Sequence, residues 1–255
     1  YDEGSSPAVL APSIVVEDVD STSVRSATVR IDDGRAGDVL AAGSPGPFSA
    51  VYDPDTFVLT LTGTGSLADV QAALRSVTYA STSDDPTSRN TDNTRQFTFN
   101  VEDDLGALSN ALVTQVAITS VNDAPEIDPD REALSVAEGE SDVVSDANLA
   151  AVDPDDAPAD LTYTVTSAPL NGTLLRSGSA VTTFTQADVD DGLVVYRHDG
   201  SETTVDVFSV SLADGGEDGA GAATAIVGID VTAQNDAPVL SGVDNAPTVF
   251  EPVDV

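Results

Sequence analysis

Short stretches in which apolar and polar residues alternate recur along the first 124 residues of the chain. Alternation with a period of two is typical of β-strands that bury one face. Turn-rich segments such as Asp53-Pro54-Asp55 separate the stretches, and about seven short strands divided by turns predict a β-sandwich. The stretches run from Ser13 to Glu17, Ser26 to Ile31, Phe48 to Tyr52, Phe57 to Thr62, Ser76 to Ala80, Gln96 to Val101 and Ala111 to Val121.

The same pattern continues over residues 125–237, which predicts a second sandwich. A short helix interrupts the alternation in each half, because Ser66 and Asp69 are spaced as a helix-capping pair and Thr185 and Asp188 repeat that spacing. We interpret the first helix as a plug that closes one end of its sandwich, rather than as a docking face for a partner. The second-half strands are expected from Ala133 to Ala137, Leu161 to Thr166, Thr173 to Leu175, Val181 to Phe184, Leu193 to Arg197, Val205 to Leu212 and Ala223 to Val231.

Each half ends in a similar short segment. Val121-Asn122-Asp123-Ala124-Pro125 returns, 113 positions later, as Gln234-Asn235-Asp236-Ala237-Pro238. Proline ends a strand and favours an extended conformation for the residue before it, so each segment predicts a short extended joint between compact units. Two such joints predict a tandem array with units at residues 1–124 and 125–237. Residues 238–255 then look like the start of a third unit, and we expect the chain to be a piece of a longer one.

The net charge is −35, from 44 acidic residues and 9 basic residues that are all arginine. This charge disfavours nucleic acid and anionic membranes as partners and favours cations. The short carboxylate of aspartate suits tight turns and the oxygen-ligand sites of hard cations. Adaptation of the surface to high salt is an alternative explanation of the same charge.

Cysteine, methionine and tryptophan are absent, which excludes disulfides and thiolate metal sites. There is no run of 18 apolar residues and no signal-like segment at the start, so we expect no insertion into a membrane. These features are typical of an extracellular bacterial protein, although the cytosol is also compatible with them.

Acidic residues recur at matching places in the two units. The carboxylates of an Asp-x-Asp turn can converge on one ion, and calcium takes six to eight oxygen ligands, so a joint could draw ligands from both of its units. The matching places are the Asp-x-Asp turns Asp18-Val19-Asp20 and Asp153-Pro154-Asp155, the strand-ending Asp103 and Asp214, and the early Glu3 and Glu138.

No catalytic site is expected. His198 is the single histidine and has no serine or cysteine partner in a recognisable motif, so we interpret it as structural. The sequence contains no nucleotide-, zinc- or phosphate-binding motif. The chain is therefore expected not to be an enzyme.

The joint Asn-Asp-Ala-Pro, the Asp-x-Asp turn, the late Asp and the early Glu together resemble cadherin-type repeats. The first unit is similar to the cadherin-like repeats of giant bacterial surface and biofilm proteins. That similarity lies in residues 14–20, 59–63, 73–79 and 121–125. The second unit resembles the repeat of chondroitin-sulfate-proteoglycan type, in residues 136–139, 161–163, 169–174, 184–186 and 196–202.

The resemblance implies Greek-key sandwiches, immunoglobulin- or cadherin-like, strung end to end and stiffened by Ca2+ at the joints. For the first joint it implies the ligands Glu3, Asn122, Asp123, Asp153, Asp155 and Asp214. For the second joint it implies Glu138, Gln234, Asn235 and Asp236, and for a further site before the first unit Asp18, Asp20 and Asp103. The cadherin Asp-Arg-Glu motif is spelled by Asp130-Arg131-Glu132 but in the wrong place, and weaker candidates for its role are Asp84, Asp85, Asp199 and Glu202.

The leading hypothesis is therefore a calcium-stiffened spacer of a bacterial cell-surface adhesin or matrix protein that supports adhesion or biofilm formation. The expected partners are calcium ions and the neighbouring repeats. A subunit of an extracellular filament or sheath, assembled through exposed edge strands, is the alternative. Recognition of a cell-surface glycan is a third hypothesis, disfavoured because only 5% of the residues are aromatic.

Overall fold

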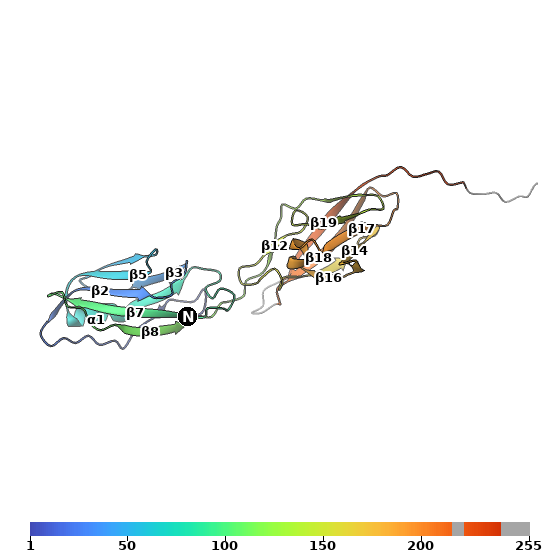
Figure 1. Cartoon of the computed structure of the whole chain (residues 1–255). Coiled ribbons are helices and arrows are strands. Elements are labelled where there is room, and N and C mark those ends of the chain that lie inside the picture. The colour runs from blue at the N-terminus through green and yellow to red at the C-terminus, as the bar shows by residue number, and fades with distance from the viewer. Residues whose placement is uncertain (216–221, 241–255) are drawn as a thin grey trace, which may run out of the picture.

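The computed structural model describes residues 1–215 and 222–240. Nearly all of the regular structure is β, and the strands form two sandwiches that follow one another along the molecule (Figure 1). Each sandwich has its own hydrophobic core, formed by residues between Leu10 and Ile118 and between Ile127 and Val231. The predicted all-β fold is confirmed, while the exact boundaries at residues 124 and 237 stay predictions. Of the predicted third unit, residues 241–255 lie outside the described residues.

The first unit packs a five-stranded sheet, in the order β4-β5-β2-β7-β8, against a three-stranded sheet in the order β1-β6-β3. One helix, α1 (Leu67–Arg75), joins β5 to β6. The strands are β1 (Ala8–Val9), β2 (Ser23–Ile31), β3 (Asp38–Ala42), β4 (Ser49–Asp53), β5 (Val58–Ser66), β6 (Val77–Ser81), β7 (Thr94–Asp103) and β8 (Leu112–Ala117).

The central strand β2 shows how the alternation builds this core. Ala27, Val29 and Ile31 are buried, and the residues between them face outward. Val29 lies opposite Leu59 of β5 and Phe99 of β7, both of which are also buried. Burial of apolar surface contributes about 25 cal/mol per Å², so this inward-facing row is a main source of the stability of the unit.

Both helices begin with the predicted capping box. Ser66 accepts a hydrogen bond from the Asp69 amide, while the Asp69 carboxylate accepts one from the Ser66 amide. Thr185 and Asp188 repeat this arrangement at the start of α2 (Gln186–Asp190). Helix α1 buries Leu74 against the core at the end of the first unit that lies away from the second unit, as expected for a plug (Figure 1).

The strand predicted from Ser13 to Glu17 is wrong. These residues pair with no other strand, because their backbone groups bond to side chains of α1 instead. The Val16 amide donates to Gln71 Oε1 at 3.2 Å, and Arg75 Nε donates to the Ile14 carbonyl at 2.8 Å. Apolar alternation alone does not distinguish such a segment from a strand.

The second unit packs a five-stranded sheet, in the order β10-β19-β18-β13-β16, against a four-stranded sheet in the order β11-β17-β14-β15. The chain crosses repeatedly between the sheets, as in a Greek-key sandwich. A separate pair, β9 with β12, lies at the start of the unit. The strands are β9 (Glu126–Ile127), β10 (Leu134–Ala137), β11 (Ser141–Val143), β12 (Ala151–Val152), β13 (Thr162–Ser167), β14 (Gly172–Arg176), β15 (Ser179–Ala180), β16 (Thr183–Thr185), β17 (Val194–His198), β18 (Val205–Ala213) and β19 (Ala223–Thr232).

Both units close in the same way at their downstream end. In the second unit β10 runs parallel to β19, and the Glu138 amide donates to the Thr232 carbonyl at 2.9 Å. In the first unit the N-terminal segment also runs parallel to the last strand segment, and the Glu3 amide donates to the Thr119 carbonyl at 2.9 Å. The N-terminus of the chain therefore lies beside the first joint (Figure 1). This pairing brings an early glutamate to the residues that lead into each joint.

Candidate metal centre at the joint between the units

The first joint, residues 121–125, has no strand pairing and is bonded to loops of the second unit. Asn122 Nδ2 donates to Asp214 Oδ2 at 2.9 Å, and the Asp123 amide donates to Asp155 Oδ2 at 2.9 Å. The structure thus brings together the linker residues and the downstream aspartates that were predicted for one site.

The upstream side of the joint supplies a second acidic group. Glu3 Oε2 accepts a hydrogen bond from the Val121 amide at 3.0 Å, which holds its carboxylate next to the joint. Carboxylate oxygens of Glu3, Asp84 and Asp123 all lie within 4.8 Å of one another. Asp84 comes from the loop between β6 and β7, so the strand pairing, that loop and the linker each contribute one carboxylate.

The downstream side is built on the Asp-Pro-Asp turn after β12. Asp153 Oδ1 accepts hydrogen bonds from the amides of Asp155 and Asp156 at 2.8 and 2.9 Å. Carboxylate oxygens of Asp153, Asp156 and Asp214 lie within 4.8 Å of one another.

Two buried oxygens in this joint fit a bound cation. Asp153 is only 8% exposed, yet its Oδ2 has no hydrogen-bond partner, and Asp155 Oδ1 is likewise buried without one. A buried carboxylate oxygen that lacks a partner is unfavourable, because burial removes its hydration without replacement. Hard divalent cations bind carboxylate oxygens and would satisfy such atoms.

The crowding of carboxylates changes their protonation. Burial, together with the charges of Asp123, Asp85 and Asp153, raises the pKa of Asp155 to about 6, even though the Asp123 amide opposes the shift. Burial also raises the pKa of Glu3, assisted by the charges of Asp155, Asp123 and Asp84. Without a counter-charge, the joint therefore disfavours full ionisation of its own carboxylates.

The second joint repeats the upstream half of this arrangement. Glu138 Oε2 accepts a hydrogen bond from the Gln234 amide at 3.0 Å, as Glu3 does from Val121. Carboxylate oxygens of Glu138, Glu202 and Asp236 lie within 4.8 Å of one another. Glu138 is 8% exposed, and its Oε1 is buried without a partner.

The other residues expected at the second joint differ in role. Gln234 takes part through its backbone amide, and Asn235 is exposed beside Asp236. The negative charge of Glu138, followed by a hydrogen bond with Asp236, raises the pKa of Glu202. The upstream half of each joint is thus an early glutamate, a loop carboxylate and the linker aspartate.

The end of the first unit that lies away from the joint has an Asp turn like that of the second unit, but its carboxylates lie less close together. Asp18 Oδ1 accepts from the amides of Asp20 and Ser21 at 3.0 and 2.9 Å, which repeats the turn of Asp153. Asp18 and the buried Asp103 line one cavity of about 150 Å³. Asp103 accepts the Ala107 amide at 2.7 Å. Over the part of the chain that the structure describes, these aspartates do not form a close group of three carboxylates.

Sequence reasoning gave little weight to three residues that the structure places in these groups. Asp84 and Glu202 were weak candidates because no motif marks the loops that carry them. Asp156 was not predicted, although it directly continues the Asp-Pro-Asp turn. The displaced Asp130-Arg131-Glu132 belongs to no acidic group among the residues described, and Arg131 donates to the Asp128 carbonyl.

His198 has a local structural role. It is buried, and its Nδ1 accepts hydrogen bonds from the amides of Gly139 and Gly200 at 3.1 and 3.2 Å. Its Nε2 lies 3.0 Å from the Thr203 hydroxyl. Both ring nitrogens therefore hold the turns that carry Glu138 and Glu202, which agrees with the structural interpretation.

The second unit matches a known family of protein domains. Residues 125–227 match the family model described as cadherin-like, so the second unit is a cadherin-like domain. The match supports the resemblance drawn from the sequence of this unit.

Two known proteins are similar in sequence to parts of the chain. The chain is 40% identical over 108 residues to mouse chondroitin sulfate proteoglycan 4, which covers 40% of the chain and 5% of that protein. It is 30% identical over 152 residues to extracellular matrix protein 3 of Lytechinus variegatus, which covers 59% of the chain and 5% of that protein. The chain is thus homologous to cadherin-like repeats of extracellular matrix proteins and spans about 5% of the length of these relatives.

Among solved structures, chicken VE-cadherin EC1-2 aligns with 91% of the chain and 96% of its own length, at 15% identity and a TM-score of 0.39. Protocadherin gamma B7 domains 1–4 align with 78% of the chain and 42% of their own length, at 15% identity and a TM-score of 0.36.

Neither helix within residues 1–215 and 222–240 is long and apolar enough to cross a membrane.

Proposed function

We propose that this chain is a calcium-stiffened spacer segment of an extracellular adhesion or matrix protein. The homology of the second unit to cadherin-like matrix repeats supports the extracellular part of the proposal. The resemblance of the first unit to repeats of bacterial surface proteins, together with the absence of cysteine, supports a bacterial cell-surface adhesin in particular.

The observation that carries the calcium proposal is Asp153, whose buried Oδ2 has no hydrogen-bond partner and whose carboxylate lies close to those of Asp156 and Asp214. Calcium prefers six to eight oxygen ligands from carboxylates, amides and carbonyls, and the joint supplies these groups from both units. The residues proposed to hold calcium are Glu3, Asp84, Asn122, Asp123, Asp153, Asp155, Asp156 and Asp214. Extracellular modules bind calcium with dissociation constants of about 0.1–1 mM, which sets the range expected here.

Calcium would stiffen the joint because its coordinating residues come from both units. Without calcium the carboxylates of the two units repel one another across the joint, and bending the joint lowers that repulsion. With calcium bound, bending would remove ligands of one unit from the ion. Calcium binds the aligned arrangement more tightly than the bent one and therefore shifts the population toward it.

Small-angle X-ray scattering of the whole chain tests the stiffening, with 5 mM EDTA in one series and about 2 mM calcium in the other, a concentration at or above the expected dissociation constant. We expect calcium to increase the maximum dimension and to narrow the distribution of interunit distances. Magnesium at the same concentration serves as the matched control, because it demands a tighter octahedral shell. A maximum dimension that is the same in EDTA, magnesium and calcium would refute the stiffening.

A further inference from the structure

Asp84 reaches the first joint on a loop that no strand pairing holds. The loop, residues 82–93, connects β6 to β7 and contains no helix or strand. Its Asp84 side chain is exposed, so burial of that side chain does not fix its position. The contacts that place Asp84 beside Glu3 and Asp123 must therefore come from the rest of the loop.

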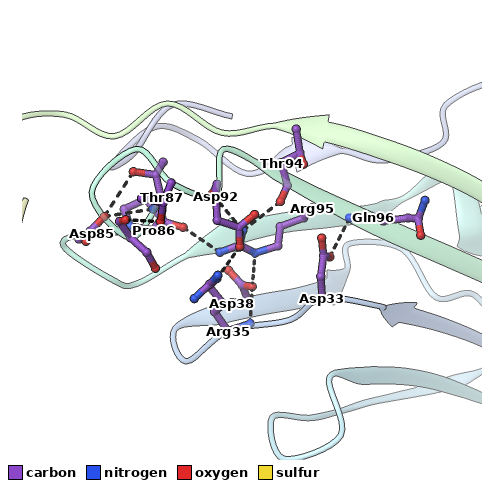
Figure 2. A network of polar contacts seen from close by, with 12 residues as sticks. Asp33, Arg35, Asp38, Asp85, Pro86, Thr87, Asp92, Thr94, Arg95 and Gln96 are labelled. Atoms are coloured by element: carbon purple, nitrogen blue, oxygen red, sulfur yellow. Dashed lines mark hydrogen bonds and ion pairs between the residues drawn. The ribbon is translucent and has the colours of Figure 1, made fainter.

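The loop is fastened to the core by a buried arginine. Arg95, near the start of β7, has a fully buried side chain whose Nε donates to Asp38 Oδ2 at 2.7 Å. The Asp38 carboxylate also accepts hydrogen bonds from the Tyr79 hydroxyl and the Arg35 amide, at 2.7 and 2.8 Å. Figure 2 shows Arg95, Asp38 and Arg35 between the strands and the loop. A buried ion pair with its remaining atoms hydrogen-bonded is well ordered, because any other geometry leaves a charge unpaired.

The same guanidinium donates to both ends of the loop (Figure 2). Its Nη2 donates to the Pro86 carbonyl at 2.7 Å, near the start of the loop. Its Nη1 donates to the Asp92 carboxylate and carbonyl at 3.2 and 3.4 Å, near the end of the loop. A planar guanidinium holds several acceptors in fixed directions, which a lysine ammonium does not.

The middle of the loop has an unfavourable backbone conformation. Ser88, Arg89 and Asn90 have φ values of 51°, 56° and 57°, a left-handed conformation that disfavours residues with a Cβ atom. Asp85 stabilises this turn by accepting the Arg89 amide at 2.9 Å. Thr87 Oγ1 accepts the Asn90 amide at 3.0 Å. The conformation persists because these contacts and the Arg95 anchor impose it.

The loop also contacts the chain that enters the joint. Thr87 Oγ1 lies 3.2 Å from Ser120 Oγ, and Ser120 directly precedes the linker. Hydrogen bonds thus connect the core ion pair and the loop with the residue that directly precedes the linker.

The second unit places its matching carboxylate more simply. Glu202 lies in the shorter loop of residues 199–204, between β17 and β18, where His198 contacts the Thr203 hydroxyl. The longer loop of the first unit is held at several points: the Thr82 amide donates to the Gly37 carbonyl at 2.9 Å, and Arg95 donates to Pro86 and Asp92.

We propose that Arg95 is a positioning residue for the first joint, which acts through residues 82–93 to hold Asp84 beside Glu3 and Asp123. The inference rests on the proposed function, because its effect is exerted on the calcium site. Loss of a group that orients a metal ligand typically lowers metal affinity by about 10–100-fold. We expect a loss near the lower end, about tenfold, since Asp84 is one ligand among several.

The test uses the whole chain with Arg95→Met and Asp38→Asn combined, which removes the loop anchor without leaving an unpaired buried charge. Calorimetry measures calcium affinity, and the site is assigned to the group of Glu3, Asp84 and Asp123 by its loss in Asp123→Asn. Hydrogen exchange at residues 87–92 reports the order of the loop. If the double variant does not fold, Arg95→Lys gives the same comparison, because it keeps the charge but lacks the fork that reaches Pro86 and Asp92.

Leu74→Ala is the matched control, because Leu74 is buried in α1 at the opposite end of the first unit. It is expected to lower the melting temperature without changing calcium affinity or loop exchange. Weaker binding and faster loop exchange in the Arg95 variants alone would support the inference. Equal weakening in Leu74→Ala, or unchanged affinity in the Arg95 variants, would overturn it while leaving calcium binding intact. No saturable binding in the unmodified chain would instead refute the proposed function, and this inference with it.

Discussion

Replacing Asp153 by asparagine should stabilise the second unit in chelator and destabilise it relative to the unmodified chain in calcium. The amide oxygen of asparagine can still accept the Asp155 and Asp156 amides, so the turn is preserved. The substitution removes one negative charge from a group whose oxygens lie within 4.8 Å of one another. It also replaces an unpartnered buried oxygen by an amide donor that faces two carboxylates.

The magnitude in chelator follows from the spacing of the charges. Two unit charges 4.8 Å apart repel by about 1 kcal/mol at the dielectric constant of water and by about 3.5 kcal/mol at an effective value of 20. Asp156 is half-exposed, and solvent therefore screens its share of the repulsion. We expect a net gain of about 1–2 kcal/mol, which corresponds to a rise in melting temperature of about 4–8 °C for a unit of this size.

Calcium should reverse the order. At a calcium concentration 100 times the dissociation constant, binding stabilises the folded state by about 2.7 kcal/mol. The unmodified chain gains this stability, whereas the variant lacks a central ligand and gains little. Its second unit should therefore melt above that of the unmodified chain in EDTA and below it in calcium.

Differential scanning calorimetry in EDTA and in 10 mM calcium, about 100 times the lower limit expected for the dissociation constant, measures both states. Asp53→Asn is the control, because Asp53-Pro54-Asp55 has the same turn, with the Asp55 amide 3.0 Å from Asp53 Oδ1. Its other oxygen accepts the Thr56 hydroxyl and is satisfied. The control should show the same small change in both buffers. A loss of stability in Asp153→Asn that is equal in EDTA and calcium would refute the reasoning.

Two further predictions concern stability alone. Although burial opposes it, hydrogen bonds from the Leu170 and Asn171 amides and the Tyr196 hydroxyl hold the pKa of Asp206 below its ordinary value. The stability that this ionised carboxylate contributes is present above the unfolded pKa of about 4 and is lost as the pH falls through the folded pKa. Asp206→Asn should therefore lower the free energy of unfolding by about 1–3 kcal/mol at pH 7. In urea unfolding between pH 2 and 5, the stability of the variant should depend less on pH than that of the unmodified chain. Ser66→Ala should lower the stability of the first unit by about 1 kcal/mol in thermal unfolding, while Ser66→Thr, which keeps the capping oxygen, should cost less.

The sequence signals on which the prediction of the joint depends are local. A proline after Asn-Asp and an Asp-Pro-Asp turn each specify backbone geometry within a few residues, and in the structure Asn122 donates to Asp214 while the Asp123 amide donates to Asp155. Asp84 was only a weak candidate, because its loop is bonded to residues distant in the sequence: Arg95 beside the loop donates to Asp38, and Thr87 within it lies against Ser120. Such long-range placement leaves no periodic pattern to read.

The buried ion pair of Asp38 and Arg95 also could not be predicted from local patterns in the sequence. Asp38 opens β3, a strand that the alternation did not predict, since a charged residue at an inward position reads as a surface position. Tyr79 on the neighbouring strand β6 and Arg95 on β7 make that burial possible. Polar residues that satisfy one another in the core are recognised only once the strands that carry them are placed side by side.

Under the proposed function, calcium binding and the alignment of the two units are coupled, because the two ends of each unit carry different parts of the site. The downstream end carries a glutamate held by the amide two residues before the linker aspartate, in both Glu3 and Glu138. The upstream end carries an Asp turn, in both Asp18 and Asp153. Each side of the first joint gathers three carboxylates. Under the proposed function, calcium completes its shell of six to eight oxygens from both sides, so its affinity depends on the two units meeting in register. Calcium can shift the balance between the aligned and the bent joint only by the difference in its affinity for these two states. Because the coordinating residues are divided between the two units, that difference is large.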